Sequence, residues 1–202
     1  MEVSNRMQYS IVHMSETREK ILLSMARLIE KQGYHATGLN EIIKDSGAPK
    51  GSLYYFFPDG KEQIGVEAIK ESGKMIAGRL RMMLREAGTP AETIHTFLGK
   101  MADSVETTRF GAGSPLTTAA VETAVTNDAI NKACRDAFDL VMEAFKDKFI
   151  AHGMDSTRAA DLAAYVTSVI EGGILLSRTY RNADPLRLVG RHLRDYLAGL
   201  AL

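Results

Sequence analysis

The chain has 202 residues, of which 45% are hydrophobic and 25% are charged. This is the composition of an ordinary globular protein, and the length allows one or two domains. Lysine and arginine total 25, as do aspartate and glutamate, so the formal net charge is zero. A neutral chain has no overall attraction to nucleic acid or to an acidic membrane, so any such binding has to come from a local arrangement of residues.

Metal, disulfide and membrane functions are not expected. Cys134 is the only cysteine and the five histidines are far apart in the sequence, which excludes a disulfide framework and the usual zinc-binding patterns. We expect no metal and no cofactor. Residues 1–20 lack the apolar run of a signal peptide, and we find no stretch of the roughly 18 apolar residues that a membrane span needs. We therefore expect a cytoplasmic protein with no membrane partner.

The N-terminal part of the chain predicts an arm and then a first helix. Residues 1–14 are polar and unpatterned, and we expect them to form a flexible arm. Apolar residues then recur at helical spacing from Glu16 to Gln32. Ser15 is a suitable N-cap and Gly33 a suitable C-terminal stop for this helix.

Two short helices and six longer ones follow. The second is predicted over 38–45 with Thr37 as its cap, and the third starts at Pro49 and ends at the helix-breaking segment 57–60. The longer helices are predicted over 61–85, 91–107, 116–125, 128–151, 156–181 and 185–199. We find no strand pattern, so the predicted fold class is all-α, with a three-helix unit at 15–60 and a six-helix unit at 61–202.

The turn between the second and third helices contains Gly47, which is the layout of a helix-turn-helix. In that motif the second helix enters the DNA major groove, and its first residues meet the base edges. Gly51 would let the helix start approach the duplex, Lys50 can reach guanine or a phosphate, and Ser52 is a small donor. The sequence therefore favours base contacts from the start of the third helix.

The aromatic run that follows serves two purposes. Phe57, with Leu53, can anchor the short helix in a core, while Tyr54 and Tyr55 offer hydroxyls to phosphates. The start of the second helix and the start of the fourth can add further phosphate contacts. The residues that we expect to contact DNA are Thr37, Lys50, Gly51, Ser52, Tyr54, Tyr55 and Lys61.

The pattern alone leaves an alternative open. Helix-turn-helix geometry also occurs as plain helical packing, and a run of four aromatic residues is more often core than interface. Residues 16–70 hold eight lysines or arginines and eight aspartates or glutamates. This segment therefore lacks the basic footprint of many DNA-binding domains.

Residues 18–64 resemble the N-terminal domain of the TetR family of bacterial one-component repressors. The densest part of the resemblance is KGSLYYFF at 50–57, with Lys-Glu soon afterwards. The matching residues are Arg18, Ile21, Ala26, Gly33, Tyr34, Thr37, Ile42, Gly47, Lys50, Gly51, Leu53, Tyr54, Phe57, Lys61 and Glu62. The segments GYHATGLN, GAPKGSLYYFFP and IEGGILLS are similar to those of the LmrA/YxaF-like branch, as is the weaker region GSPLTTAAVETA.

The resemblance implies a division of roles. Lys50, Gly51 and Ser52 would lie against bases, and the other four expected DNA contacts against phosphates. Residues 61–202 would form a ligand-binding and dimerisation domain, and the protein would be a repressor that a small hydrophobic or aromatic effector releases from DNA. Two departures are Pro49, where many members carry a capping Ser or Thr, and one extra residue at Asp59-Gly60, which affects the aim of Lys61.

The last two predicted helices can form a dimer interface. The helix over 156–181 is apolar nearly all round, so it needs cover on two sides, and the helix over 185–199 has a leucine-rich stripe. Packing of both helices across a two-fold axis would satisfy them as a four-helix bundle, whereas burial inside one monomer is the alternative. A homodimer predicts a palindromic operator.

A ligand pocket is predicted with less detail. The candidate lining residues are Phe97, Met101, Thr118, Glu122, Tyr165 and Glu171. Each of the first three, and Tyr165, can equally be plain core. The two glutamates can face a ligand, hold an interface contact, or be exposed or salt-bridged, because a buried acid needs a partner.

Three glycines, Gly65, Gly73 and Gly78, fall in the predicted fourth helix. Each costs about 1 kcal/mol relative to alanine in a helix interior. We expect them to permit close packing or bending, so that this helix can move the DNA-binding unit when a ligand binds.

An enzyme or carrier that does not bind DNA is the competing function. GAGSP at 111–115 superficially resembles a phosphate-binding loop, but no strand precedes it. We find no Ser/His/Asp set and no carboxylate pair at helical spacing, so no catalytic residues are assigned.

Overall fold

The computed structural model describes the backbone of residues 2–86, 88–111 and 113–200, and the side chains of these ranges from residue 16 on. Within these ranges the chain forms nine α-helices and no strand, which confirms the all-α prediction. The helices are α1 (Glu2–Gln32), α2 (Leu39–Ser46), α3 (Lys50–Phe56), α4 (Lys61–Leu84), α5 (Pro90–Thr107), α6 (Pro115–Thr123), α7 (Asp128–Ala151), α8 (Ser156–Tyr180) and α9 (Asp184–Gly199).

Helix boundaries from α2 onward lie within two residues of the predicted ones, because local capping residues set most of them. Thr89 and Glu92 form a reciprocal capping box at the start of α5. Asn127 caps α7 and Asp155 caps α8, each accepting a hydrogen bond from a first-turn backbone N–H.

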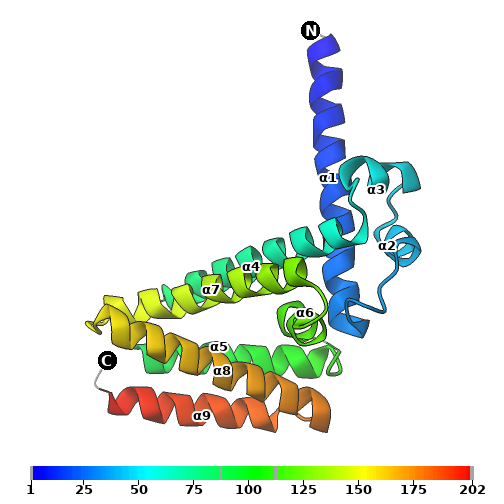
Figure 1. The fold of residues 1–202 in the computed structure, drawn as a ribbon. Helices are drawn as coiled ribbons and strands as arrows, with labels where there is room; N and C mark the ends of the chain where they lie inside the picture. The colour runs from blue at the N-terminus through cyan, green and yellow to red at the C-terminus, as the bar shows by residue number, and fades with distance from the viewer. Residues whose placement is uncertain (1, 87, 112, 201–202) are drawn as a thin grey trace.

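The predicted start of the first helix is wrong. We expected the helix to begin at Glu16 after a Ser15 cap, whereas α1 begins at Glu2. No glycine or proline interrupts residues 2–15, so nothing in the covalent chain stops the helix from continuing through Ser15. Figure 1 shows these N-terminal turns projecting beyond α3. Whether this segment is flexible stays a prediction.

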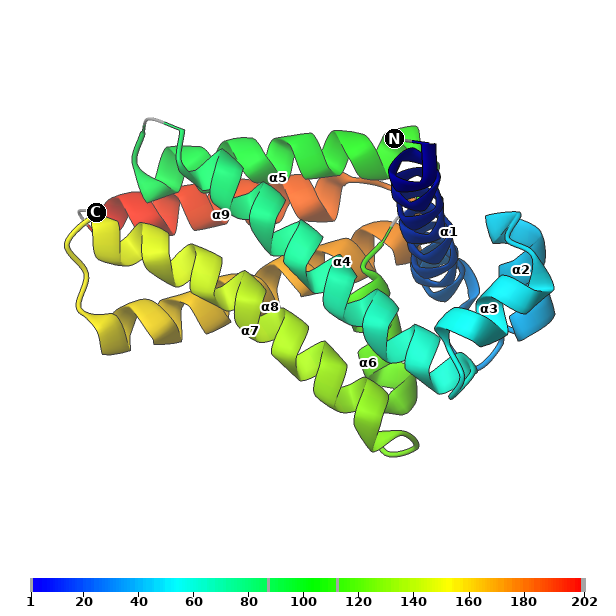
Figure 2. The same cartoon turned by 90° about the horizontal axis from the view of Figure 1, so that it is seen from above.

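The helices form a small N-terminal unit and a larger bundle. Figure 1 shows α1, α2 and α3 at one end, with α4 leading away from them beside α7. Beneath this pair lie α8, α5 and α9, and Figure 2 shows α5 and α9 running side by side along the opposite edge from α7. The short α6 lies where the two parts meet and packs against α1, α4 and α7.

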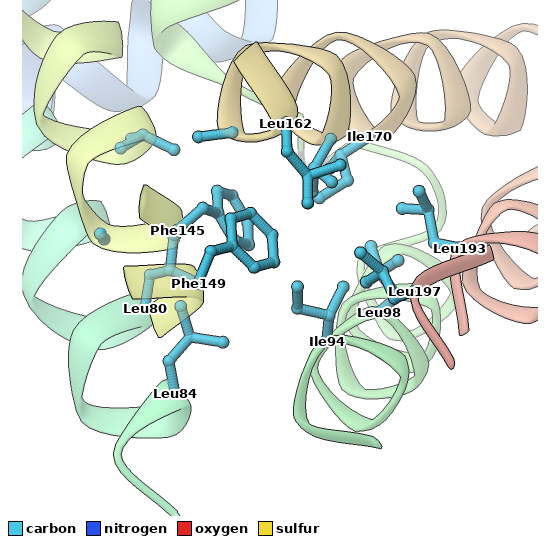
Figure 3. Packing of buried hydrophobic residues seen from close by; sticks show 14 of the residues in the cluster. Leu80, Leu84, Ile94, Leu98, Phe145, Phe149, Leu162, Ile170, Leu193 and Leu197 are labelled. Atoms are coloured by element: carbon cyan, nitrogen blue, oxygen red, sulfur yellow. The ribbon is translucent and has the colours of Figure 1, made fainter. Parts of the chain in front are cut away.

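The bundle has its own hydrophobic core. Phe145 and Phe149 of α7 are almost fully buried at its centre, between α4, α5 and α8 (Figure 3). The ring of Phe97 packs edge-to-face on Phe145, with 6.5 Å between the ring centroids. This core holds α4, α5, α7, α8 and α9 together as one body.

A second hydrophobic core crosses the predicted domain boundary at residue 60. It begins with buried residues of α1, α2 and α3 and continues through Ile64 and Ala68 of α4 into Leu116 of α6 and Ile130 of α7. The N-terminal unit is therefore packed directly on α6 and α7, in addition to its covalent link through α4.

Two of the three α4 glycines lie where another helix approaches closely. A Cβ added at Gly73 would lie 2.5 Å from the Cβ and 2.9 Å from the Cα of Ala137 on α7. A Cβ at Gly65 would lie 2.8 Å from side-chain atoms of Tyr34 and Ile130, whereas Gly78 has open space. Close packing thus explains Gly65 and Gly73 but not Gly78.

Helix α8 is long and apolar enough to cross a membrane when judged by length and composition alone. The sequence analysis predicted no stretch of this length and composition, and that prediction is wrong for α8. The inner face of α8 is buried against α7 and α9 through Ala159, Val166 and Ile170. Its apolar composition therefore partly reflects a place in the protein core.

Candidate nucleic-acid interface and internal cavity

Helix α3 has a buried side and an exposed side. Leu53 and Phe57 are fully buried in the N-terminal core, and the guanidinium of Arg18 lies 5.3 Å from the Phe57 ring centroid. Tyr54 is 47% exposed and Tyr55 69% exposed, so both hydroxyls are open to a partner. The aromatic run is thus divided between anchoring and presentation, as predicted.

The start of α3 is also accessible. Lys50 and Gly51 are exposed and Ser52 is half-buried, while Pro49 occupies the N-cap position rather than the first helical turn. A Cβ added at Gly51 would meet no atom of the chain within 4 Å. Packing within the chain therefore gives no reason for glycine at this position.

Side-chain contacts hold α2 against α1. Asp45 accepts a hydrogen bond of 2.5 Å from the Ser24 hydroxyl and forms an ion pair with Arg27. The Ser24 hydrogen bond, together with the Arg27 charge, holds the pKa of Asp45 below its ordinary value. Gly47 then makes the turn into α3 with a φ of 67°, a conformation that favours glycine.

Thr37 does not have the predicted capping role. Its side chain is buried, and its hydroxyl donates to the carbonyl of Gly33 at 2.7 Å. Gly38 occupies the N-cap of α2 and makes no side-chain hydrogen bond. Thr37 therefore stabilises the turn between α1 and α2, and its hydroxyl is not presented to an external partner.

Lys61 is directed toward the same turn. Its ammonium donates to the carbonyl of His35 at 3.2 Å and lies 4.5 Å from the Tyr34 ring centroid. Burial lowers the pKa of Lys61, and the nearby carboxylate of Glu122 opposes this effect. The predicted phosphate contact would require this ammonium to leave the turn.

Glu122 lies at the junction between α6 and the N-terminal unit. Its carboxylate accepts a hydrogen bond from the backbone N–H of His35 at 3.0 Å. It occupies the space beside Gly33, where an added Cβ would lie 1.8 Å from Glu122 Oε1. The His35 ring also lies within 3.3 Å of the Glu122 carbonyl and 3.2 Å of the Thr126 hydroxyl. His35 and Thr126 were missed because their partners are far away in sequence.

A small internal cavity lies between α4, α5, α6, α7 and α8. Phe97, Met101 and Glu171, three of the six predicted pocket residues, line it together with Leu116 and Phe145. Its volume is only ≈ 50 Å³, which is room for a few water molecules and far below the hundreds of Å³ of a typical ligand site. This space is therefore too small for a typical ligand.

Glu171 is the acidic group of the cavity. Its carboxylate accepts a hydrogen bond of 2.5 Å from the Thr117 hydroxyl on α6. Burial raises the pKa of Glu171, although the Thr117 hydrogen bond opposes the rise.

The remaining predicted pocket residues lie outside this cavity. Thr118 is half-buried on α6 and does not line it. Tyr165 is 50% exposed on the outer side of α8, where its ring packs on Tyr196 of α9 with 5.7 Å between centroids. Leu176 and Leu188 are also exposed on these two helices. The outer face of α8 and α9 is therefore an apolar surface without cover in the monomer.

Comparison with known proteins identifies the chain. Residues 21–68 match the profile of the bacterial regulatory proteins of the tetR family, and residues 90–192 match the C-terminal domain of LmrA/YxaF-like transcriptional regulators. The chain belongs to the TetR family. It is a helix-turn-helix transcriptional regulator of the LmrA/YxaF-like branch, as the sequence motifs predicted.

Individual relatives agree with this assignment. The HTH-type regulator YxaF of Bacillus subtilis (strain 168) is 39% identical over 178 residues, which cover 88% of this chain and 93% of that protein. LmrA of the same strain is 39% identical over 182 residues, covering 90% of this chain and 97% of that protein. These relatives are regulators of transcription, not enzymes.

Solved structures show the same fold. A TetR regulator from Legionella pneumophila superposes with a TM-score of 0.78 at 25% identity, covering 89% of this chain and 96% of that chain. The reduced form of NemR from Escherichia coli superposes with a TM-score of 0.75 at 20% identity, with the same coverage. Among the residues that the structure describes, no cluster of His, Cys, Asp and Glu is arranged to hold a metal ion.

Proposed function

We propose that this TetR-family protein is a cytoplasmic repressor that binds a palindromic DNA operator as a homodimer and is released by a small hydrophobic or aromatic effector. The two-sided α3 carries the proposal. Its buried side fixes the helix, and its exposed start presents Lys50, Gly51 and Ser52 for base contacts. Tyr54 and Tyr55 extend from the exposed side toward phosphates.

The two remaining expected contacts need a modified role. Thr37 acts by holding the turn before α2, so that backbone groups rather than its hydroxyl approach a phosphate. Lys61 reaches a phosphate only after its ammonium leaves the His35 carbonyl. Strong phosphate attraction in a neutral N-terminal unit therefore depends on a small number of cations, and a modest salt dependence follows.

The homodimer forms through the outer face of α8 and α9. Tyr165, Leu176, Leu188 and Tyr196 on this face are 46–50% exposed in the monomer, and a two-fold copy would cover them. Two α3 helices would then meet half-sites about 34 Å apart, or a multiple of that distance. A palindromic operator is the consequence.

The effector acts by enlarging the small cavity. Helix α6 connects the two parts, since Thr117 near its start bonds to Glu171 in the cavity and Glu122 near its end bonds to His35. A molecule that enlarges the cavity displaces the start of α6, and the end of α6 transmits this to the turn before α2. A full switch needs about 5.5 kcal/mol of differential binding between the two states.

Selection of bound fragments from genomic DNA tests the proposal. The expected result is enrichment of palindromic sites that wild type retains against excess random competitor and that Lys50→Ala does not. Lys100→Ala, the same substitution at an exposed position on α5, is the matched control and keeps wild-type enrichment. A protein with the competing function, binding small molecules without DNA, would enrich no site.

A further inference from the structure

An open cleft lies beside the small cavity, where the loop between α5 and α6 meets the C-terminal end of α8. Its volume is about 670 Å³, and it is lined by Arg109 and Phe110 of the loop and by Leu175, Arg178 and Arg181 at the end of α8. Three guanidinium groups and two apolar side chains therefore share one concave surface in a chain whose net charge is zero.

The three arginines have no carboxylate partner. Among the described residues, no aspartate or glutamate oxygen lies within 4.0 Å of the guanidinium of Arg109, Arg178 or Arg181, although other ion pairs form elsewhere. Arg178 donates to the backbone carbonyl of Glu30 at 3.4 Å, which is a neutral acceptor. Like charges gathered without a counter-charge repel one another, so the cleft favours an anion.

The nearby carboxylates are already engaged. Asp103 and Glu106, at the end of α5, both pair with Arg187 of α9. The Glu30 carboxylate accepts a hydrogen bond of 2.5 Å from the backbone N–H of Gly113. Neutralisation by Asp103 or Glu106 would require their ion pairs with Arg187 to break. Glu30 keeps its charge near Arg178 and offsets part of that cation. This leaves Arg109 and Arg181 as the cations of the cleft without a nearby carboxylate among the described residues.

Backbone strain is concentrated on the same surface. Arg109, Phe110 and Arg181 have φ values of 51°, 62° and 49°, and they are the non-glycine residues with positive φ in the described part of the chain. Each such residue costs about 1–2 kcal/mol. Arg181 is the left-handed C-cap of α8, and Arg109 and Phe110 close the last turn of α5, so the ends of these two helices place the three side chains. All three residues line this one cleft.

The cleft and the small cavity are lined by neighbouring segments of the chain, although no residue lines both. Ser114 and Leu116, just after the strained loop, line the cavity, and so do Glu171 and Ile174, just before Leu175 on α8. Phe110 packs against the core of the bundle. Phe110 is therefore the side chain of the cleft that connects it to the core of the bundle.

We propose that this cleft binds an amphipathic anion, with its carboxylate, sulfonate or phosphate at the arginines and its apolar part directed along Phe110 toward the core of the bundle. Arg109 and Arg181 are the exposed cations that hold the anionic group, and Arg178 completes the site from α8. If this anion is the effector of the proposed repressor, the cleft defines the chemical class of that effector, and this part of the inference rests on the proposed function. Binding of the anion in the cleft does not depend on the proposed function.

A matched pair of fluorescent probes tests the site. Anilinonaphthalene sulfonate is an aromatic anion, and phenylnaphthylamine is the same ring system without the sulfonate. The wild-type full chain should bind the anionic probe saturably. The Arg109→Gln/Arg181→Gln double variant should bind it at least tenfold more weakly, and the neutral probe with unchanged affinity, since hydrogen bonds to charged groups are the strong ones.

Two further variants separate charge from folding. Arg109→Lys/Arg181→Lys should recover most of the affinity for the anionic probe. Arg79→Gln/Arg135→Gln removes two exposed arginines on α4 and α7 and should behave as wild type. Thermal unfolding of each variant shows that the fold is retained.

The proposal is overturned if wild type does not bind the anionic probe saturably. That result would also follow if a partner subunit covered Leu175 and Thr179, which line the cleft on α8. It is also overturned if the glutamine double variant binds both probes as wild type does. Operator binding without probe is measured in parallel. If wild type binds no operator, the proposed function is contradicted. If wild type binds the operator but its probe binding does not depend on Arg109 and Arg181, only the anion site is contradicted.

Discussion

The carboxylate of Glu122 on α6 accepts a hydrogen bond of 3.0 Å from the backbone N–H of His35, in the turn between α1 and α2. This bond joins the bundle to the DNA-binding unit across 87 residues of sequence. We predict that Glu122→Ala loosens the turn. Exchange of the His35 amide proton should become about tenfold faster, because a hydrogen bond to a charged acceptor contributes about 1.5–3 kcal/mol when it is well formed and less at a half-buried site.

The control for this prediction is Glu143→Ala on α7, whose carboxylate pairs with Lys146 at the surface. Exchange at His35 should be unchanged in that variant, and amides in the centre of α8 should be unchanged in both. Equal protection of His35 in Glu122→Ala and wild type would show that the bond does not hold the turn.

Gly51 separates folding from DNA binding. The chain leaves open space at its Cβ position, as it does at Gly78 on α4. Alanine at either position should therefore raise the free energy of unfolding by up to about 1 kcal/mol through helix propensity. Only Gly51→Ala should weaken operator binding, by tenfold or more, because its methyl group would lie where α3 approaches the duplex.

Urea unfolding and fluorescence anisotropy with a selected operator measure these two effects. Gly78→Ala is the matched control, with the same substitution and the same open surroundings. Wild-type operator affinity in Gly51→Ala would mean that α3 does not meet DNA through its first turn.

Most of the fold was predictable because its signals are local. Proline, glycine and capping residues stand at the ends of α2 to α9, and they act on the helix that contains them. The start of α1 was predicted wrongly because residues 2–15 carry no local stop signal and only a weak apolar pattern. A good N-cap such as Ser15 can lie inside a helix when the preceding residues also propagate it.

The site was less predictable because it depends on rotation of each helix about its axis. Helix α8 is apolar on both sides, so periodicity could not tell that Glu171 faces the cavity and Tyr165 the outside. On α6, Thr117 and Glu122 act at opposite ends of a nine-residue helix. Only the packing of α6 against α1 and α8 distinguishes these roles.

We predict that alanine at Gly73 disturbs the packing of α4 against α7. Its added Cβ would lie 2.9 Å from the Cα of Ala137, a backbone atom that cannot turn away. Gly73→Ala should therefore force α4 and α7 apart and lower the free energy of unfolding by about 1–3 kcal/mol. This contrasts with the stabilisation expected for Gly78→Ala. The sequence predicted that Gly65, Gly73 and Gly78 permit close packing or bending of α4. Close packing accounts for Gly65 and Gly73, and nothing in the structure explains Gly78.

Chemical denaturation of the two single variants tests this contrast. A further variant, Ala137→Gly with Gly73→Ala, removes the opposing Cβ and should restore part of the loss. If Gly73→Ala is as stable as wild type, the close approach of α4 and α7 does not constrain this position.

The outer face of α8 predicts a specific disruption of the homodimer. Leu176 is 47% exposed there in the monomer. Leu176→Asp should place a charge in the proposed interface and yield monomers at micromolar concentration, because an unpaired buried charge is strongly unfavourable. Operator binding should fall with it, since one α3 contacts only a half-site.

Val125→Asp is the control, because Val125 is 94% exposed in the turn after α6 and away from α8. Sedimentation velocity should show that this variant assembles as wild type does. A dimeric Leu176→Asp protein would place the interface elsewhere.

Glu171 predicts a pH-dependent stability difference. Burial raises its folded pKa above its ordinary value of 4.5, so between these two pKa values the folded protein binds more protons than the unfolded chain. This group therefore lowers stability as pH rises through that window. Glu171→Gln removes the effect while keeping an acceptor for the Thr117 hydroxyl, so the variant should be more stable than wild type at neutral pH.

The gain should be absent below pH 4.5 and should grow by about 1.4 kcal/mol for each pH unit up to the folded pKa. Urea unfolding of both proteins across this pH range measures the difference, and Glu86→Gln, at an exposed position after α4, should show no such trend. A pH-independent difference between Glu171→Gln and wild type would mean that Glu171 titrates normally and is hydrated in the folded protein. In that case water already enters the small cavity.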